Sequence, residues 1–308
     1  MRDVAATLAA GNLVAFPTET VYGLGADACN ADAVARIYSV KGRPSDHPLI
    51  VHISSMQRMG DWAEEIPEYA IKLARDFWPG PMTLVLKRSS LAKDFITGGQ
   101  ETVGVRVPDH VIALALLEAF EIIGGKGLAA PSANRFGQVS PTTAAAVADE
   151  LEEFLDSNDK IIDGGACVVG VESTIIDCTD DNPRILRPGA ITASMVKEST
   201  GLECIATLGN SIRVSGSLES HYAPAAKVLL CEIPTAGQGF IALASIQTPS
   251  GVIRLASPHD DEEFAQILYS ALRQADIQGL AEVVISQPSG MGIAIAIRDR
   301  ISRAGNGR

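Results

Sequence analysis

Short apolar runs of strand length alternate with segments of helical periodicity over the first 200 residues. Strands are predicted at residues 13–16, 49–53, 82–86, 103–107, 128–130, 161–163, 173–177 and 184–186. Helices are predicted at residues 31–40 after the capping residue Asn30, at 68–77, at 109–120, and from Ser140-Pro141, with Ser140 as N-cap. This mixture predicts one α/β domain over residues 1–200.

The pattern weakens over residues 201–226, where small and polar residues predict a linker. A second unit follows at 227–308. Its predicted strands lie at 227–231, 240–244, 251–255 and 282–285, and its predicted helices at 260–275 and 292–302. We therefore expect a smaller, three-layer α/β C-terminal domain.

Composition narrows the class of protein. The length of 308 residues fits two domains of about 150 residues each. The net charge of −12 disfavours tight non-specific binding of nucleic acid, which depends on Lys and Arg. No apolar run approaches the ~18–20 residues of a membrane helix. The five cysteines are dispersed without a C-x-x-C pair, so we expect no zinc site and a cytoplasmic protein.

The common catalytic signatures are absent: the sequence has no P-loop, no complete G-x-G-x-x-G, no H-E-x-x-H and no G-x-S-x-G. The first unusual segment, residues 17–25, directly follows a predicted buried strand. It places the hydroxyls of Thr18 and Thr20 and the carboxylate of Glu19 at the strand's carboxyl end, where α/β sheets bind ligands. A tight glycine-containing loop is an equally good interpretation.

Four further segments carry candidate polar groups. Lys41 and Arg43 follow a predicted helix and can face one anion, although a solvated loop pair is the simpler interpretation. His52 lies in an apolar strand, where a core histidine is more common than a functional one. Arg106 also lies in an apolar strand, so it needs a carboxylate from the protein or from a ligand. The loop with Ser132 and Asn134 suits a nucleotide or an ordinary turn.

Seven collinear segments together resemble the YrdC-like family of L-threonylcarbamoyladenylate synthases. The segments are FPTETVYGLG, KGRPSDHPLIVHI, WPGPMTLVL, TVGVRVPDH, APSANRFGQVSPTTA, VESTIID and ILRPGAIT. They span almost all of residues 8–193, and the chain beyond them resembles the long form of the family. The resemblance implies an open, twisted mixed sheet with a concave ligand cavity, plus the C-terminal domain joined through a linker that closes as a lid.

The resemblance also implies a reaction: condensation of L-threonine, bicarbonate and ATP to threonylcarbamoyl-AMP and pyrophosphate, the first step of a tRNA modification. Mg²⁺ is expected with the ATP, and no metal ligands are expected from the protein. Downstream partners would be the tRNA-modification transferase machinery, with weak or no direct binding of tRNA. The alternatives are an RNA-binding module or a carbamoyl-transfer module of the same fold.

Site residues follow from the resemblance by motif position. The implied threonine contacts are Thr20, His52, Arg106, Ala130 and Ser173. The implied ATP contacts are Arg43, His47, Thr102, Ser132, Asn134, Ser140, Arg187 and Tyr222. Lys41 and Arg43 are the implied catalytic cations, which would stabilise charge on the phosphates. His47 departs from the family pattern, in which Asn is usual.

Overall fold

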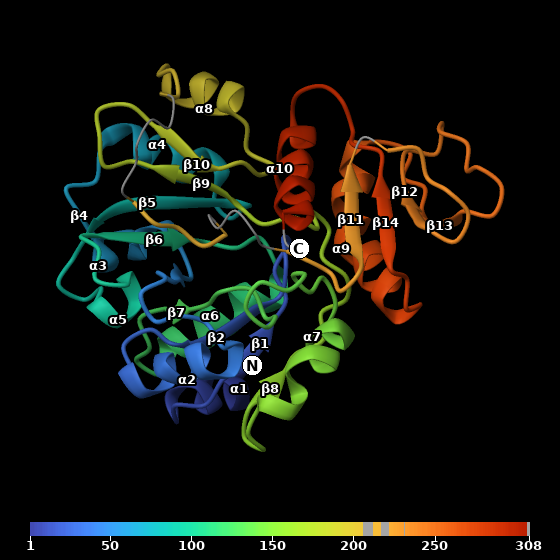
Figure 1. Cartoon of the computed structure of the whole chain (residues 1–308). Helices are drawn as coiled ribbons and strands as arrows, with labels where there is room; N and C mark the ends of the chain where they lie inside the picture. Colours follow the sequence, from blue (N-terminus) through green and yellow to red (C-terminus); the bar gives the residue numbers. More distant parts are fainter. Residues whose placement is uncertain (206–211, 217–221, 231, 307–308) are drawn as a thin grey trace.

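Two sheets of different size organise the chain in the computed structural model (Figure 1). The structure describes residues 1–205, 212–216, 222–230 and 232–306. The predicted linker at 201–226 therefore lies partly outside the described residues. None of the described helices is long and apolar enough to cross a membrane.

The helices are α1 (Arg2–Ala9), α2 (Ala31–Lys41), α3 (Met59–Trp62), α4 (Glu68–Phe77), α5 (Asp94–Thr97), α6 (Val111–Ile122), α7 (Ala144–Leu151), α8 (Ala193–Thr200), α9 (Asp261–Ile277) and α10 (Ile293–Gly305). Single 3₁₀ turns are η1 (Met56–Arg58) and η2 (Glu152–Phe154). The strands are β1 (Val14–Phe16), β2 (Gly23–Asp27), β3 (Ile50–His52), β4 (Ala63–Glu64), β5 (Met82–Arg88), β6 (Thr102–Arg106), β7 (Leu128–Ala129), β8 (Lys160–Ile161), β9 (Thr174–Asp177), β10 (Arg184–Arg187), β11 (Lys227–Leu230), β12 (Gly239–Ile241), β13 (Ile253–Ala256) and β14 (Glu282–Ile285).

The large sheet is mixed, as predicted. Its strand order is β10-β9-β5-β6-β3-β7-β2-β1-β8, and β4 pairs with β5 outside this path. Neighbouring strands β3 and β6 run parallel, whereas β5 and β6 run antiparallel. The parallel register brings His52 opposite Arg106, so two candidate site residues are neighbours on adjacent strands.

One face of the large sheet is buried beneath helices. Helices α2, α4, α7 and α8 contribute to one apolar cluster with strand residues such as Val51, Leu84 and Val105. Since side chains alternate along a strand, Ile50, His52 and Arg106 point to the opposite face.

Among the described residues, helices cover that opposite face at one end only. There, α1 and α6 pack on residues of β1 and β7, including Val14, Phe16 and Leu128. Over β5 and β9 the face is covered instead by Val214, which packs on Val85 and Ile175. The uneven coverage leaves a hollow on this face, and the site described below lies in it.

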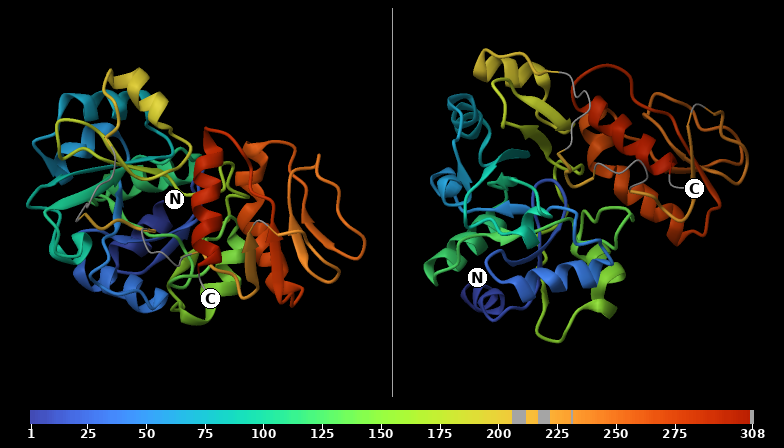
Figure 2. Two further views of the ribbon diagram at one scale, coloured as in Figure 1. Left: turned by 45° about the horizontal axis from the view of Figure 1, so that its top comes forward. Right: turned by 60° about the vertical axis from the view of Figure 1, so that its left-hand side comes forward.

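The C-terminal sheet is entirely parallel, in the order β11-β14-β12-β13. Helices α9 and α10 both pack on one of its faces, against Val228, Ile241 and Val283 (Figures 1 and 2). Leu229, Phe240 and Val284 form a separate cluster on the other face.

The α/β class of this domain is confirmed, but the three-layer expectation is wrong. Among the described residues no helix covers the second face, so the domain has two layers. Parallel strands are usually joined by a helix that covers one face of the sheet. Here β12 and β13 pair in parallel, but residues 242–252 between them contain no helix.

The predicted helix start at Ser140 is also wrong. Helix α7 begins at Ala144, and the Thr143 hydroxyl accepts a hydrogen bond from the Ala146 amide at 3.2 Å. Ser140 does not cap a helix because its hydroxyl donates to Glu172 Oε1 at 2.6 Å. A tertiary partner therefore outweighs the local Ser-Pro signal.

This assignment predicts the effect of removing the true cap. Thr143→Ala should destabilise the protein by about 1 kcal/mol, because one amide of the first turn of α7 loses its acceptor. The shift in the denaturant midpoint, followed by circular dichroism, measures this loss. An unchanged midpoint would show that α7 does not depend on this cap.

Candidate functional site

A cavity opens on the face of the large sheet opposite to α2, α4, α7 and α8. Nine of the residues predicted from the sequence line it: Thr20, Arg43, His52, Arg106, Ala130, Ser132, Ser173, Arg187 and Tyr222. These side chains come from the whole length of the N-terminal domain and from the segment that leads into the C-terminal domain. The expectation of a concave cavity is therefore confirmed, and most of the predicted residues converge on it.

The loop after β1 is fixed by its own hydroxyl groups. Thr18 Oγ1 donates to the Val21 carbonyl at 2.7 Å and accepts from the amides of Thr20 and Val21. The Thr20 hydroxyl lies 2.9 Å from Thr18 Oγ1 and is fully buried at the cavity wall. Thr18 also lines the cavity, although it was not among the predicted contacts.

Arg106 has a protein carboxylate as its partner. Its Nη2 forms an ion pair with Glu19 Oε2 at 2.6 Å, and its Nε donates to the Gly80 carbonyl at 3.3 Å. Both side chains are about 95% buried, with exposed fractions of 5% and 4%. The sequence left open whether the partner of Arg106 is a carboxylate of the protein or of a ligand. In the structure it is a carboxylate of the protein, and Arg106 also lines the cavity.

His52 is neutral in the folded protein. Burial, and secondly the positive charge of Arg106, lowers the pKa of His52 to about 3. Its ring packs edge-on against Phe16, with 5.9 Å between ring centroids. His52 thus combines both interpretations considered for it: it is a buried core residue and it lines the cavity.

Lys41 and Arg43 do not point in the same direction. Lys41 ends α2, and its Nζ donates to the carbonyls of Ser132, at 2.6 Å, and Asn134. Burial lowers the pKa of Lys41 well below its usual range. Arg43 instead lines the cavity and donates to the Pro48 carbonyl at 3.0 Å. Of the two cations, only Arg43 faces the cavity, and Lys41 holds the loop at 132–134 in place.

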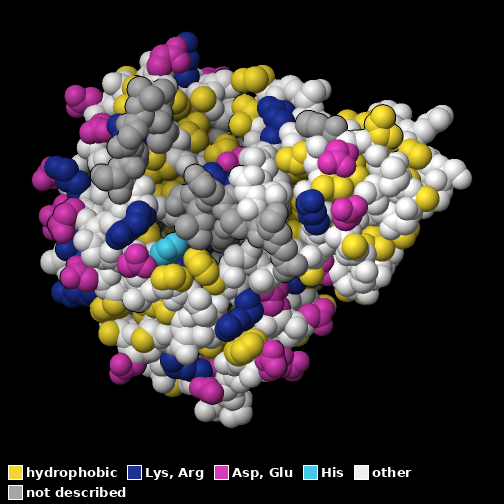
Figure 3. Space-filling model, viewed as in Figure 1, with side chains coloured by type: hydrophobic (Ala, Val, Ile, Leu, Met, Phe, Trp, Pro, Cys, Tyr) yellow, Lys and Arg dark blue, Asp and Glu magenta, His cyan; other side chains and the backbone are white. Residues whose placement is uncertain are grey.

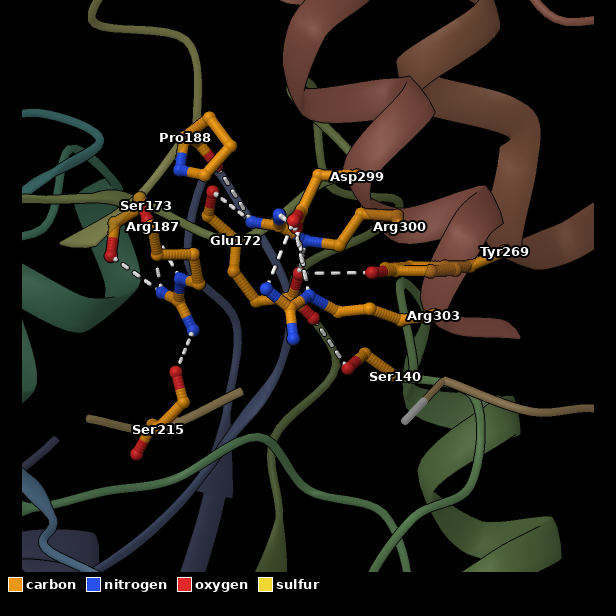
Figure 4. A network of polar contacts seen from close by, with 10 residues as sticks. All are labelled: Ser140, Glu172, Ser173, Arg187, Pro188, Ser215, Tyr269, Asp299, Arg300 and Arg303. Carbon is orange, nitrogen blue, oxygen red and sulfur yellow. Dashed lines mark hydrogen bonds and ion pairs between the residues drawn. The ribbon is translucent and has the colours of Figure 1, made fainter. Parts of the chain in front are cut away.

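Arg187, on β10, forms the opposite cationic wall. Its Nε and Nη2 donate to the Ser173 carbonyl at 3.1 and 3.0 Å, and Nη2 also reaches Ser173 Oγ (Figure 4). Its Nη1 donates to the Ser215 carbonyl at 2.9 Å. Ser215 Oγ in turn lies 3.2 Å from Arg43 Nη2. One serine therefore bridges the two arginines across the cavity.

Tyr222 lies on the C-terminal side of the cavity and is 1% exposed. Its ring stacks on Tyr269, with 5.7 Å between centroids, and the Arg300 guanidinium lies 5.4 Å from its centroid. A Cβ at Gly216 would lie 2.2 Å from the Tyr222 hydroxyl, so this close approach requires glycine. Tyr222 is thus packed between the two domains.

Five predicted residues do not line the cavity: Lys41, His47, Thr102, Asn134 and Ser140. His47 packs edge-on against Phe136 at 5.4 Å, and Thr102 lines a neighbouring hollow. Asn134 Nδ2 donates to the carbonyls of Arg135 and Gln138, at 2.7 and 3.0 Å. Their predicted roles toward ATP stay predictions.

Glu172 and Arg300, like Thr18, are missing from the site residues predicted from the sequence. Glu172 lines the cavity within the quoted VESTIID segment, but nothing local marked its carboxylate as buried. Arg300 lies 128 positions further along the chain and pairs with it at 2.7 Å. The pairing connects two domains, so no spacing within either one could reveal it.

The described residues offer no evident metal cage. No group of three or more His, Cys, Asp or Glu side chains is placed to hold an ion in the described part of the chain. Near the cavity, both oxygens of Glu172 accept hydrogen bonds, and Glu19 pairs with Arg106. The expectation of Mg²⁺ with the ATP stays a prediction.

The neutral state of His52 predicts a pH dependence of stability. Below pH 6.5 the unfolded chain binds a proton at His52 that the folded chain does not bind until about pH 3. Stability should therefore fall by about 1.4 kcal/mol per pH unit as the pH drops through this window. His52→Gln should lose this contribution, as measured by denaturant unfolding at several pH values. Equal slopes for both proteins would contradict a neutral His52.

Comparison with known proteins gives matches along nearly the whole chain. The Sua5/YciO/YrdC family model, described as telomere recombination, matches residues 6–189. A second, described as the C-terminal domain of threonylcarbamoyl-AMP synthase, matches residues 191–306. Both domains seen in the structure thus have counterparts in known families.

Individual relatives agree with this result. A threonylcarbamoyl-AMP synthase of Pyrococcus abyssi is 41% identical, with 99% of this chain and 93% of that protein covered. One of Bacillus subtilis is 38% identical, with the same coverage. The crystal structure of P. abyssi Sua5 complexed with L-threonine superposes with a TM-score of 0.88 at 38% identity, covering 100% of this chain and 94% of that one.

These matches support the synthase interpretation rather than an RNA-binding or carbamoyl-transfer module of the same fold. The collinear segments, the convergent cavity and the two-domain architecture all agree with it. The chain therefore belongs to the threonylcarbamoyl-AMP synthases, in the form that carries a C-terminal domain.

Proposed function

We propose that the single cavity holds both substrates of threonylcarbamoyl-AMP synthesis, L-threonine at one end and ATP at the other. The observation that carries this proposal is the convergence of Arg43, Arg106 and Arg187 on one cavity. Three guanidinium groups suit ligands with a carboxylate and a triphosphate. The L-threonine in the P. abyssi structure supports threonine as one of the two.

The threonine end consists of Thr20, His52 and Arg106, with Ala130 and Ser173 beside them. Arg106 uses Nε and Nη2 for the protein, so its Nη1 is left to donate to the threonine carboxylate. The neutral His52 adds a polar group without repelling the substrate ammonium. The small side chain of Ala130 leaves room for the substrate methyl group.

The ATP end consists of Arg43 and Arg187, with Ser132 and Tyr222 beside them. Both arginines contact Ser215 in this structure. A triphosphate would take over these donors, so residues 212–216 would have to shift when ATP enters. In this proposal Lys41 acts by fixing the loop that carries Ser132, and the segment around Ser215 acts as the lid.

The chemistry needs positioning and charge stabilisation and no covalent nucleophile from the protein. The threonine ammonium first gives up a proton. The free amine then forms a C–N bond to the carbon of bicarbonate, water leaves, and a carbamate results. A carbamate oxygen then attacks the α-phosphorus, the bond to the β-phosphate oxygen breaks, and pyrophosphate leaves. Arg43 and Arg187 stabilise the charge that develops on the phosphates. Mg²⁺ would accompany the nucleotide, held by phosphate oxygens and water.

The product carries an activated threonylcarbamoyl group, so the protein would serve a transferase that modifies tRNA. The net charge of −12 supports weak or no direct binding of tRNA by this chain. The dispersed cysteines support a cytoplasmic location. Transfer of the group to tRNA would therefore occur on partner proteins.

The proposed reaction predicts a substrate requirement. Pyrophosphate release from ATP by the full chain should need L-threonine and bicarbonate together, because the attacking group is the carbamate that they form. A coupled phosphate assay measures this, with L-serine and a bicarbonate-depleted buffer as controls. Release at the same rate without threonine would contradict the proposal.

A second prediction separates the two ends of the cavity. Arg106→Ala should raise the KM for threonine by about tenfold or more and leave the KM for ATP nearly unchanged, since a charged hydrogen bond contributes about 1.5–3 kcal/mol. Arg43→Ala should do the reverse. Steady-state kinetics with each substrate varied in turn measures the split. An equal loss toward both substrates in Arg106→Ala would assign Arg106 a structural role with Glu19.

A further inference from the structure

Arg300 belongs to the C-terminal domain, yet its guanidinium contacts the wall of the cavity. It lies on α10 and is fully buried. Its Nε donates to Glu172 Oε2 at 2.7 Å, and its Nη2 donates to the Pro188 carbonyl at 2.9 Å (Figure 4). Both acceptors belong to the N-terminal domain, so Arg300 joins the two domains at the site.

Glu172 carries a full negative charge at this place. Its Oε1 accepts from Ser140 at 2.6 Å, and its Oε2 accepts from the Tyr269 hydroxyl at 2.9 Å and from Arg300. Burial alone raises the pKa of Glu172, but the positive charges of Arg300 and Arg187 outweigh this and hold the pKa at about 2. The carboxylate is thus ionised and lines the cavity that is proposed to receive ATP.

The two acceptors of Arg300 adjoin Arg187 and the residue that holds its guanidinium, Ser173. Glu172 precedes Ser173, and Pro188 follows Arg187. Arg187 is bound to the Ser173 carbonyl through both Nε and Nη2. By holding residues 172 and 188, Arg300 fixes the backbone on either side of this Arg187–Ser173 contact.

The interface around Arg300 is closely packed, so the contact is built into the fold. One apolar cluster joins Val21, Val139 and Val171 of the N-terminal domain to the core between α9 and α10. A Cβ at Gly170 would lie 2.3 Å from the Gln266 backbone of α9. Figures 2 and 3 show the C-terminal domain seated against the large domain along this side.

Removing Arg300 would change the charge that ATP meets. The Glu172 carboxylate would remain buried without its principal cation, and of the two guanidinium groups that lower its pKa only that of Arg187 would remain. A buried carboxylate that loses its partner recruits another cation or opposes an incoming anion. Either outcome weakens the binding of phosphates at Arg187.

We propose that Arg300 is a positioning residue for the synthase reaction: it neutralises Glu172 and so keeps Arg187 available to the nucleotide. Arg300 itself touches neither substrate. The inference rests on the proposed placement of ATP beside Arg43 and Arg187. It assigns the C-terminal domain a part in building the nucleotide end of the site.

The test compares KM values for both substrates in the full chain. Arg300→Met should raise the KM for ATP by about tenfold or more. A factor of ten corresponds to about 1.4 kcal/mol, and an unpaired buried carboxylate costs more than that. The KM for threonine should change by less than about twofold, the usual limit for uncoupled sites. Pyrophosphate release at varied ATP and at varied threonine measures both.

A second variant gives a readout that a merely structural role would not move. Glu172→Gln combined with Arg300→Met removes the charge together with its partner, and should return the KM for ATP to within about twofold of that of Glu172→Gln alone. If Arg300→Met alone fails to fold, as judged by near-UV circular dichroism, the double variant and Glu172→Gln carry the test. In Glu172→Gln, Arg300 keeps its ion pair with Asp299, and in the double variant Asp299 keeps its ion pair with Arg303.

The matched control is Arg298→Met on the same helix. Arg298 donates to the carbonyls of Pro288 and Gly290, both within the C-terminal domain, so its loss should leave both KM values unchanged. The inference is overturned if Arg300→Met behaves like Arg298→Met, or if it raises the KM values for ATP and threonine together. It is also overturned if adding Glu172→Gln to Arg300→Met leaves the KM for ATP as high as in Arg300→Met alone. A wild-type chain without threonine-dependent pyrophosphate release would instead overturn the proposed function itself.

Discussion

The burial of several guanidinium groups around one cavity is the constraint on which the rest of the site depends. Arg43, Arg106, Arg187 and Arg300 are each 7% exposed or less, and each needs acceptors to offset the loss of water. Arg106 and Arg300 have carboxylate partners, Glu19 and Glu172. Arg43 and Arg187 bind mainly carbonyl and hydroxyl oxygens. Within the described part of the chain, Arg43 and Arg187 have no carboxylate partner at hydrogen-bond distance, and these are the two arginines proposed to bind the triphosphate.

This division follows from how the large sheet is covered. Among the described residues, helices cover one face of the sheet and reach the other at its β1 end only. Ile50 and His52 of β3 and Arg106 of β6 therefore point into a hollow. The hollow is closed by residues 212–216 and by Tyr222, which lead into the C-terminal domain. The same segment thus links the two domains and forms part of the cavity wall.

The C-terminal domain also holds parts of the N-terminal domain and of the linker in place. Arg273 on α9 pairs with Glu150 at 2.7 Å and also donates to the Val139 carbonyl, beside Ser140. Asp276 accepts from the amides of Ala225 and Ala226, at 3.0 and 2.9 Å, and so fixes the end of the linker. Together with Arg300, these contacts set the position of the linker relative to the cavity.

The sequence by itself determined the layered α/β plan, the two domains, and nine residues of the cavity. The plan and the domains follow from hydrophobic periodicity, and the nine residues follow from the resemblance of seven collinear segments to a known family. Only the tertiary structure decided that Ser140 serves Glu172 instead of a helix, that Lys41 holds a loop, and that Arg106 pairs with Glu19. Each of these depends on which acceptor lies within about 3 Å of a donor after folding. The partners are 32 to 93 positions apart in the chain, and Arg300 and Glu172 are 128 apart, so no local pattern encodes their meeting.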